Sequence, residues 1–335
     1  MRPRSAPAQV PGELARWIGA TRPAPPIATL TLQPSLDVSY EVDTLQDDRK
    51  LHASRYRVDP GGNGINVARA LHRLGLASHA CVVAAGDLGT AMLRLLRREL
   101  PQVHGIRADG QTRINATVEQ HRPPSQYELI GQGPPLGDDT LRRAGRQLRP
   151  HGAGGLAVLT GLPPQGRDAS LYCAMARELR AQATRVVLDM PGAELARVLE
   201  FGAMLIKPNR WEFEQLTGRE LPRLEDVQRE ACALRQRSPV DVVCVSLGAQ
   251  GALLACAQGV WYGEAPPVDV RSTVGAGDSM LAGLLAGLAC GAAAAQALRL
   301  GLACGSATAA QPGTELFDPA QLPPLLERLR VRQLG

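Results

Sequence analysis

A glycine-rich run stands directly before an apolar segment of helical length: Ser272-Thr273-Val274-Gly275-Ala276-Gly277-Asp278-Ser279. Glycines let the backbone turn tightly, so that successive N–H groups can converge on an anion where the helix begins. Asp278 would lie in the first turn beside that anion, where its carboxylate could accept a proton from an attacking hydroxyl. An aspartate at a helix start often serves only as a cap, and this run alone leaves both interpretations open.

A second glycine-rich run also leads into a helical pattern: Pro60-Gly61-Gly62-Asn63-Gly64-Ile65-Asn66-Val67-Ala68-Arg69. Its glycines allow a polar ligand to approach the backbone closely, and Asn66 would face the same pocket from the first turn. A plain loop-to-helix turn is the other interpretation. The run is neither G-x-G-x-x-G nor G-x-x-x-x-G-K-[ST], which disfavours an NAD-dependent oxidoreductase and a Walker phosphate loop.

Apolar runs of buried-strand type alternate with helical patterns along most of the 335-residue chain. The predicted strands lie at residues 27–32, 81–85, 156–160, 186–190, 204–207 and 242–246. The predicted helices lie at residues 65–74, 88–100, 168–182, 192–200, 211–217, 224–237, 279–289 and 294–310. This alternation predicts an α/β fold with a doubly wound, mostly parallel sheet, helices on both faces, and ligands beyond the carboxyl ends of the strands.

Two segments break this alternation. Residues 37–60 and 112–131 alternate polar and apolar side chains without helical spacing, as in Asn115-Ala116-Thr117-Val118-Glu119. We expect them to form antiparallel strands outside the main sheet. Such strands would make a small β-sheet lid that closes over the ligand site at the edge of the main sheet.

The composition excludes several classes of protein. Hydrophobic residues make up 44% of the chain and charged residues 21%, which allows a large core and excludes wholesale disorder. Aromatic residues make up only 3%, which disfavours the binding of single-stranded nucleic acid by stacking. The net charge is +5, but basic and acidic side chains are interleaved, so we expect no nucleic-acid partner.

Residues 1–26 are rich in Arg, Pro and Ala, and we expect a flexible extension before a single domain at 27–335. The stretch between Asp278 and Arg299 carries no charge, but it is mostly Ala and Gly and is interrupted at Gly291. We therefore expect two core helices there and no membrane span.

The seven cysteines are scattered and form no C-x-x-C pair, which indicates buried thiols in a reducing cytoplasm.

The chain, from about residue 27 to its end, resembles the ribokinase-like PfkB carbohydrate kinases. The Gly61–Val67 run is similar to the family's first motif, and the run from 272 to 280 is similar to its second. The phosphofructokinase branch fits best. Its further motifs are similar to Thr31-Leu32-Gln33-Pro34-Ser35-Leu36-Asp37, Thr112-Arg113-Ile114-Asn115, Lys207-Pro208-Asn209-Arg210-Trp211-Glu212 and Ser246-Leu247-Gly248-Ala249-Gln250-Gly251-Ala252-Leu253.

This resemblance implies an ATP- and Mg²⁺-dependent sugar-phosphate kinase and assigns its residues. The sugar pocket would be formed by Asp37, Gly61, Gly62, Asn63 and Asn66, with Arg113 and Lys50 near the phosphate that the sugar already carries. A guanidinium fork suits such a phosphate because it donates two parallel hydrogen bonds. ATP would be bound by Lys207, Asn209, Ser246, Gly248, Gly251 and Thr273.

The resemblance implies that Asp278 is the base and that the amides of Gly275, Ala276 and Gly277 stabilise the phosphoryl group during transfer. Glu212 would hold Mg²⁺ through water. A monovalent cation such as K⁺ is a further cofactor that the family admits. Lys50 and Lys207 are the only two lysines in the chain, and both fall on family positions.

Some positions depart from the family pattern. The segment Thr160-Gly161-Leu162-Pro163-Pro164-Gln165-Gly166 lacks a serine that contacts substrate in the family, and His52 and Glu128 stand where 6-phosphofructokinases have arginines.

The favoured reaction is phosphorylation of fructose 6-phosphate at its C1 hydroxyl, giving fructose 1,6-bisphosphate. A 1-phosphofructokinase or a tagatose-6-phosphate kinase remains an alternative. A catalytically weak sugar-phosphate sensor is the alternative of another class, which the intact Asp278 and Glu212 disfavour.

The resemblance also implies a homodimer in which two lids pack face to face, because an isolated small sheet leaves an apolar face and two edges exposed. Apolar side chains with alternating spacing are available for that face: Val38, Tyr40, Val42, Ile114, Ala116 and Val118. Lys50 would then reach the active site of the neighbouring subunit.

Overall fold

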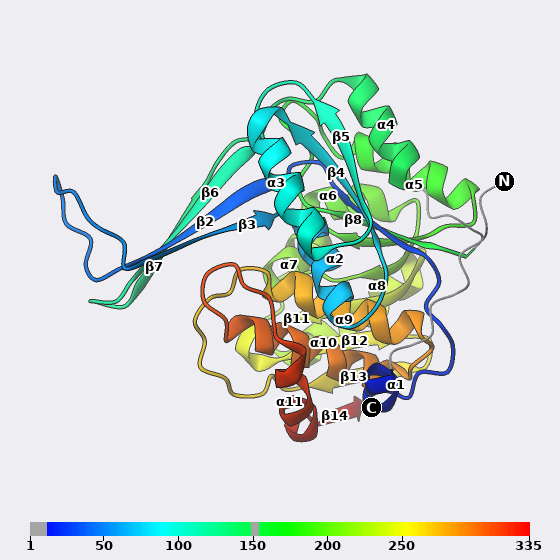
Figure 1. Ribbon diagram of the computed structural model, residues 1–335. Helices are drawn as coiled ribbons and strands as arrows, with labels where there is room; N and C mark the ends of the chain where they lie inside the picture. Colours follow the sequence, from blue (N-terminus) through cyan, green and yellow to red (C-terminus); the bar gives the residue numbers. More distant parts are fainter. Residues whose placement is uncertain (1–11, 149–153) are drawn as a thin grey trace.

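The structure, a computed structural model, describes residues 12–148 and 154–335. Its main sheet has ten strands in the order β14-β13-β12-β11-β10-β9-β8-β1-β4-β5 (Figure 1). These strands are β1 (Ile27–Thr31), β4 (His79–Ala85), β5 (Val103–Ala108), β8 (Leu156–Thr160), β9 (Arg185–Asp189), β10 (Ala203–Ile206), β11 (Val240–Ser246), β12 (Ala252–Cys256), β13 (Gly259–Gly263) and β14 (Val331–Leu334).

The strands from β11 to β5 pair in parallel, whereas β12, β13 and β14 continue the sheet antiparallel at one edge. The predicted doubly wound, mostly parallel sheet is therefore confirmed. The helices are α1 (Gly12–Ile18), α2 (Asn63–Arg73), α3 (Gly86–Glu99), α4 (Asp138–Leu148), α5 (Ser170–Ala181), α6 (Gly192–Leu199), α7 (Arg210–Thr217), α8 (Leu224–Arg237), α9 (Ala276–Ala289), α10 (Ala294–Ala309) and α11 (Leu322–Arg328).

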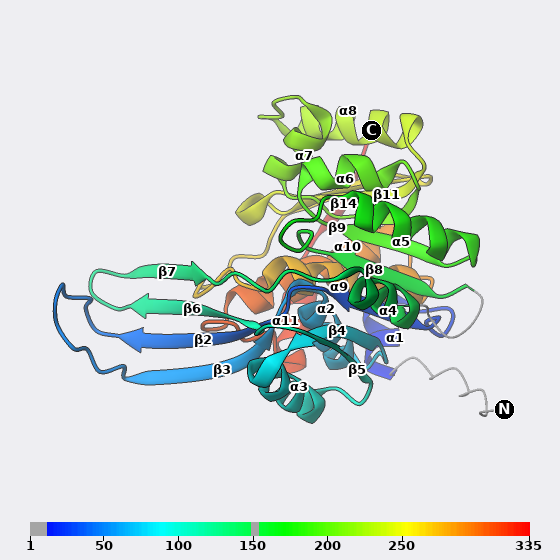
Figure 2. The ribbon, with the colours of Figure 1, turned by 90° about the horizontal axis from the view of Figure 1, so that it is seen from above.

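Helices cover both faces of the main sheet (Figure 2). Successive side chains of a strand point to opposite faces, and β4 shows the division. Ala80 and Val82 pack with α2 and α3, whereas Cys81 and Val83 pack with α4. The first face also carries α1, α9, α10 and α11, and the second carries α5, α6, α7 and α8.

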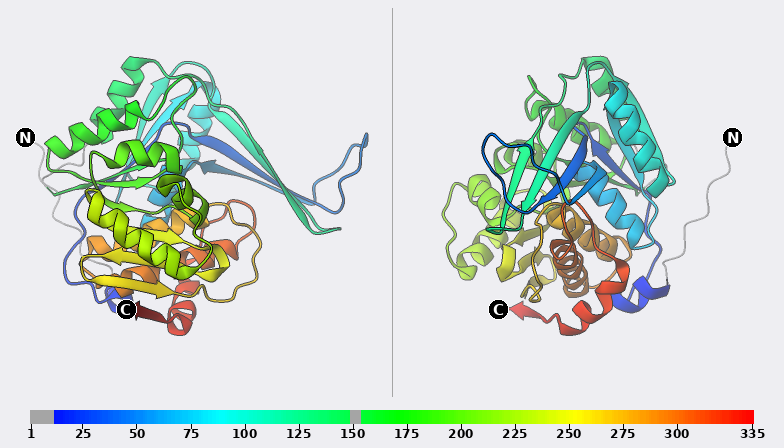
Figure 3. Two further views of the ribbon diagram at one scale, coloured as in Figure 1. Left: turned by 180° about the vertical axis from the view of Figure 1, so that it is seen from behind. Right: turned by 60° about the vertical axis from the view of Figure 1, so that its left-hand side comes forward.

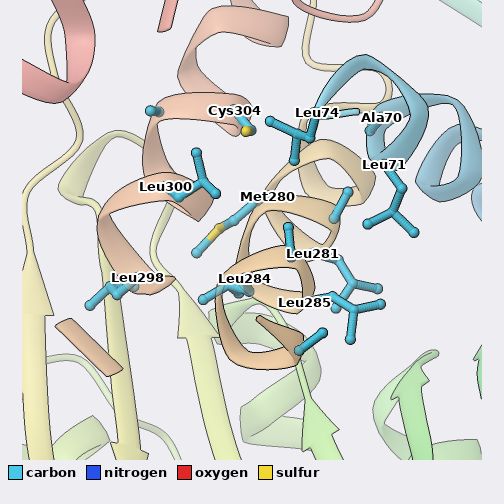
Figure 4. Packing of buried hydrophobic residues seen from close by; sticks show 14 of the residues in the cluster. Ala70, Leu71, Leu74, Met280, Leu281, Leu284, Leu285, Leu298, Leu300 and Cys304 are labelled. Carbon is cyan, nitrogen blue, oxygen red and sulfur yellow. The ribbon is translucent and has the colours of Figure 1, made fainter. Parts of the chain in front are cut away.

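Helices α9 and α10 pack closely along their lengths because small residues lie between them. A Cβ atom added at Gly283 would lie 2.9 Å from the Cα of Gly301, and one added at Gly287 would lie 2.7 Å from the Cα of Ala297. Leucines and methionine fill the space around this pair (Figure 4). The core is therefore aliphatic, as the composition predicts, and no helix in the described ranges is long and apolar enough to cross a membrane.

The second sheet is the predicted lid. Its strands β2 (Ser35–Val42), β3 (Arg55–Gly61), β6 (Arg113–Gln120) and β7 (Ser125–Ile130) lie in the order β3-β2-β6-β7 and project from the body (Figures 1 and 3). The prediction of purely antiparallel strands is wrong, because β2 pairs with β6 in parallel. The reason is that β2 and β6 each continue outward from parallel strands of the main sheet, β1 and β5.

Residues 12–26 differ from the flexible extension that we expected. Helix α1 packs on the body, and Ile18 is 1% exposed within the main core. The N–H groups of Thr21 and Arg22 both donate to Cys290 O, at 3.0 and 3.2 Å. Residues 1–11 of the expected extension lie outside the described residues.

Candidate active site

The N-terminus of α9 begins at Gly275, whose φ of 75° is left-handed and therefore favours glycine. The first N–H groups of a helix have no acceptor within it. The Ala276 N–H donates to Thr273 O at 3.3 Å. Within the described residues, the N–H groups of Gly275 and Gly277 have no such backbone acceptor and are available to bind an anion. A Cβ atom added at Gly277 would lie 3.5 Å from Lys207 Nζ, so an ammonium group stands beside these amides.

Asp278 is buried in the first turn of α9, with 6% of its surface exposed. Asn63 Nδ2 donates to Asp278 Oδ1 at 3.2 Å, and Asn66 Nδ2 donates to Oδ2 at 2.9 Å. Burial, helped by the charge of Asp189, raises the pKa of Asp278 to about 6 against the opposing effects of Asn66, Lys207 and Asn63. A base with this pKa is ionised at neutral pH and still accepts a proton readily.

Lys207 directly follows β10, and Asp189 ends the neighbouring strand β9. Lys207 Nζ lies 3.4 Å from Asp189 Oδ1, and both side chains are almost buried. Burial lowers the pKa of Lys207, but the carboxylates of Asp189, Asp278 and Glu212 outweigh burial and hold this pKa above its usual value. The sequence analysis missed Asp189. The sequence feature that could have identified Asp189 is an acidic residue at the carboxyl end of a predicted strand, where ligands bind.

Asn209 and Glu212 cap α7 reciprocally. Asn209 Oδ1 accepts the Glu212 N–H at 2.9 Å, and Glu212 Oε2 accepts the Asn209 N–H at 2.8 Å. The atoms that remain for ligands are Asn209 Nδ2 and Glu212 Oε1. Burial raises the pKa of Glu212, because water no longer stabilises its charge.

Glu212 and Asp189 line the same cavity and are the carboxylates that fit Mg²⁺ there. The described part of the chain contains no group of three or more His, Cys, Asp or Glu side chains that could hold a metal ion. Mg²⁺ commonly keeps several waters and binds through one or two carboxylates together with substrate phosphates. The residues present therefore fit Mg²⁺ as an ion brought with a nucleotide.

Asp37 stands at the root of the lid and is 7% exposed. Its Oδ1 accepts hydrogen bonds from Ser35 Oγ at 2.6 Å and from Asn115 Nδ2 at 3.0 Å. A Cβ atom at Gly61 would overlap the Asp37 carboxylate, so glycine is required for this approach. Burial raises the pKa of Asp37, although both hydrogen bonds and the charge of Arg113 oppose the shift.

Arg113 begins β6 and is anchored by the backbone of two loops. Its Nη2 donates to Gln33 O at 3.0 Å, and its Nη1 reaches Gly131 O at 3.5 Å. Its buried Nε has no hydrogen-bond partner within the described residues. The guanidinium lines the cavity, and a planar cation of this kind suits an incoming oxyanion.

A cavity of about 570 Å³ joins the root of the lid to the main sheet. Thr31, Thr160 and Asp189, the last residues of β1, β8 and β9, line one side, and Asn63 and Arg113 line others. The cavity thus lies beyond the carboxyl ends of the parallel strands, where ligands of open α/β sheets bind. Thr160 and Gln33 also line the cavity, and they were not predicted as pocket residues although both lie in segments compared with family motifs, because neither side chain carries a charge.

Three of the predicted nucleotide residues lie at the end of β11, the strand beside β10, or in the loop that follows it. Ser246 ends β11, and its N–H donates to Pro208 O at 3.0 Å. Gly248 and Gly251 turn the following loop with φ values of 60° and 103°. A Cβ atom at Gly251 would overlap Gly263 O, so this loop packs tightly on β13. Thr273 is exposed just before α9.

The structure does not bring Lys50 to this site. Lys50 was expected on a lid strand, but it is exposed in the loop of residues 43–54 that joins β2 to β3. This loop extends away from the body at the tip of the lid (Figures 1 and 3). Antiparallel pairing of β2 with β3 ends at Glu41 and Arg55, which leaves the loop outside the sheet.

Comparison with known proteins identifies the family. Residues 34–321 match the family described as pfkB family carbohydrate kinase. The chain is 34% identical over 291 residues to the ATP-dependent 6-phosphofructokinase isozyme 2 of Escherichia coli (strain K12), covering 87% of this chain and 94% of that protein. It is 33% identical over 302 residues to the 1-phosphofructokinase of Bacillus subtilis (strain 168), covering 89% and 97%.

A solved structure of phosphofructokinase-2 from Escherichia coli, in complex with substrates and products, superposes with a TM-score of 0.85 at 33% identity, covering 90% of this chain and 98% of that one. A ribokinase of Arabidopsis thaliana shares the fold, with a TM-score of 0.69 at 20% identity, covering 91% and 99%. The chain therefore belongs to the pfkB family of carbohydrate kinases. The predictions of a ribokinase-like fold and of an ATP-dependent enzyme that phosphorylates a sugar hydroxyl are confirmed.

Proposed function

We propose that this kinase phosphorylates fructose 6-phosphate at its C1 hydroxyl, with Asp278 as the base. One observation carries the proposal: a buried carboxylate with a pKa of about 6, in the first turn of α9, is hydrogen-bonded by Asn63, which lines the same cavity as Arg113. A sugar phosphate in this cavity can place its phosphate against the guanidinium of Arg113, and the Asp37 carboxylate, whose charge interacts with Arg113, would accept hydrogen bonds from the sugar hydroxyls.

The proposed step is an in-line displacement. The C1 oxygen forms a bond to the γ-phosphorus of ATP as the bond from that phosphorus to the β–γ bridging oxygen breaks, and ADP leaves with the bond's electrons. The hydroxyl proton moves to Asp278. The amides of Gly275 and Gly277 and the ammonium of Lys207 stabilise the charge on the transferring group.

Mg²⁺, bound with ATP near Glu212 and Asp189, would neutralise charge on the phosphate oxygens. K⁺ is the expected monovalent cation, and a related phosphofructokinase-2 structure from Escherichia coli is described as a complex with potassium. The seven free cysteines accord with the cytoplasm as the expected compartment.

We also propose that the enzyme acts as a homodimer through its lids. Strand register places Val38 beside Ala116 and Tyr40 beside Val118 on one face of the lid. Tyr56 pairs with Tyr40 and Leu129 pairs with Ala116, so both belong to the same face. Tyr56 is 71% exposed and Leu129 is 61% exposed. Exposed apolar surface of this kind marks an interaction site. A related phosphofructokinase-2 from Escherichia coli is described as having a tetrameric inhibited form.

In such a dimer, the loop of residues 43–54 could bring Lys50 to the partner's cavity. That arrangement would supply a second cation for the sugar phosphate, because Arg113 is the only basic side chain that lines the cavity among the residues described. Lys50 is exposed and separate from its own subunit's site, which is compatible with this role.

The test is a panel of sugar phosphates incubated with ATP and read by ADP release. Fructose 6-phosphate should give the highest kcat/KM. A higher kcat/KM for fructose 1-phosphate or tagatose 6-phosphate would instead indicate a 1-phosphofructokinase or a tagatose-6-phosphate kinase. Tight binding of a sugar phosphate without ADP release would support the sensor and contradict the proposal.

A further inference from the structure

Asn63 is the first residue of α2, and its side chain reaches across to α9. Its Nδ2 donates to Asp278 Oδ1 at 3.2 Å, and Asn66, three residues further along α2, donates to Oδ2 at 2.9 Å. Each oxygen of the carboxylate therefore has its own amide donor. Asn66 is buried, whereas Asn63 is exposed and lines the cavity of about 570 Å³.

A carboxamide must present its NH₂ group to a carboxylate, because its oxygen would repel the negative charge. Two such donors, one on each oxygen, fix the plane of the carboxylate, whose torsion is otherwise broad. A carboxylate has about four lone-pair sites, so two amides leave sites for a substrate hydroxyl. Orientation matters because a general base acts only within hydrogen-bond reach of the proton that it takes.

We propose that Asn63 is a positioning residue, whose amide holds the Asp278 carboxylate oriented toward the cavity for proton transfer. This role differs from direct contact with the sugar, which we expected for Asn63 from the sequence. The inference rests on the proposed function, in which Asp278 is the base. Asn66 supports the carboxylate from within the core, and Asn63 supports it from the cavity side.

Charged and titratable groups from several elements surround this carboxylate. The charges of Asp189 on β9 and of Lys207, which follows β10, both act on Asp278. Glu212 of α7 and the buried thiol of Cys244 on β11 act electrostatically on Lys207. Loss of the Asn63 amide removes a donor that favours the ionised carboxylate, while these other groups remain. The pKa of Asp278 should therefore rise in a variant without that amide.

The experiment compares Asn63→Ala and Asn63→Gly with Asn63→Gln, whose longer side chain keeps an NH₂ donor. Loss of the amide should lower kcat by roughly 10-fold, as expected for one hydrogen bond to a charged group, with little change in KM for either substrate. The acidic limb of the kcat–pH profile should move to higher pH, and Asn63→Gln should recover part of both effects. Gln165→Ala is the matched control, because this carboxamide lines the same cavity, and it should leave the acidic limb in place.

A higher sugar KM with unchanged kcat and an unchanged acidic limb would make Asn63 a substrate ligand and overturn the proposal. Unaltered kinetics in both Asn63→Ala and Asn63→Gly would overturn it as well. Infrared difference spectra of the carboxyl, assigned with Asp278→Asn, report protonation of Asp278 without turnover. These spectra test the contact between Asn63 and Asp278 even if the enzyme phosphorylates no sugar phosphate. Absence of phosphorylation would refute the proposed function only. An Asp278 titration unchanged by both variants would contradict the proposal whatever the kinetics.

Discussion

Asp189 Oδ1 lies 3.4 Å from Lys207 Nζ, at the ends of neighbouring parallel strands. The Asp189 charge acts on two neighbouring groups: it helps to keep Lys207 protonated, and it adds to the effect of burial on the Asp278 carboxyl. The pair is therefore an electrostatic link between the proposed phosphate ligand and the proposed base.

Asp189→Asn should separate these two effects. Removal of the negative charge lowers the pKa of Asp278, so the acidic limb of the kcat–pH profile should move to lower pH. The limiting kcat should nevertheless fall by about 10-fold or more, because Lys207 loses its buried counter-charge. Rate measurements from pH 5 to pH 9, at saturating ATP and sugar phosphate, decide this. An acidic limb that moves to higher pH would contradict the link.

Asp278→Asn should remove activity and also increase stability at alkaline pH. Burial raises the pKa of this carboxyl from 3.8 to about 6, so ionisation is less favourable in the folded chain than in the unfolded one. Stability is lost as pH rises from the lower value to the higher, and the loss is complete above it. The asparagine variant should be more stable by about 1–3 kcal/mol at pH 8, with a smaller difference at pH 4.

Turnover of the same variant should fall by roughly 100-fold or more. Chemical denaturation at both pH values and ADP release measure the two effects separately. A variant that loses stability at pH 8 would instead show that the carboxylate serves mainly as a helix cap.

Arg113→Ala should raise the KM for the sugar phosphate far more than the KM for ATP, because the guanidinium lines the cavity that we propose holds the sugar phosphate. An Arg–phosphate contact gives charge-assisted bonds of about 1.5–3 kcal/mol, so an increase of roughly 10- to 100-fold is expected. Arg107→Ala is the control, since this exposed arginine on β5 does not line the cavity. Equal effects on both substrates would remove Arg113 from the sugar site.

Lys207→Arg should reduce kcat and raise the KM for ATP, although the charge is kept. The lysine is 4% exposed, and its amine fits between Asp189 and the start of α9. A planar guanidinium is larger and does not act as a compact point charge. Steady-state kinetics with varied ATP test this, and unaltered values would show that a point charge is not required.

Val118→Asp should dissociate the proposed dimer and lower activity, because it places a charge on the apolar face of the lid. Gln126→Asp adds the same charge to the opposite face of the same sheet and should leave the dimer intact. Light scattering during titration with sugar phosphate reports the mass, and ADP release from the same samples reports the activity. A fully active monomer would end the dimer proposal.

The sequence predicted the elements best where local periodicity and burial agree. The predicted strand at 156–160 and the predicted helix at 224–237 match β8 and α8 residue for residue. The edge strands β12, β13 and β14 were missed because their placement depends on pairing with distant strands, which no local pattern encodes. Helix α4 was missed although its apolar face is buried, because six of its eleven residues are charged or amide-bearing.

The candidate site was predicted through motifs, and the gaps in that prediction have physical causes. Glycine runs and charged residues such as Arg113 are visible in a sequence because few other residue types can replace them. The hydrogen bonds from Asn63 and Asn66 to Asp278 join residues more than 200 positions apart and follow only from the packing of α2 against α9. Asp189 was missed for the same reason, since its importance comes from the neighbours that the sheet order gives it.

The glycines between α9 and α10 have a consequence for the reaction itself. Asp278 belongs to the first turn of α9, and Gly283 lies more than one turn further along the same helix. A methyl group at Gly283 would push α9 away from the backbone of Gly301 and so displace the carboxylate at the end of the helix. A substitution deep in the interior is therefore expected to slow the proposed proton transfer to Asp278 in a protein that still folds.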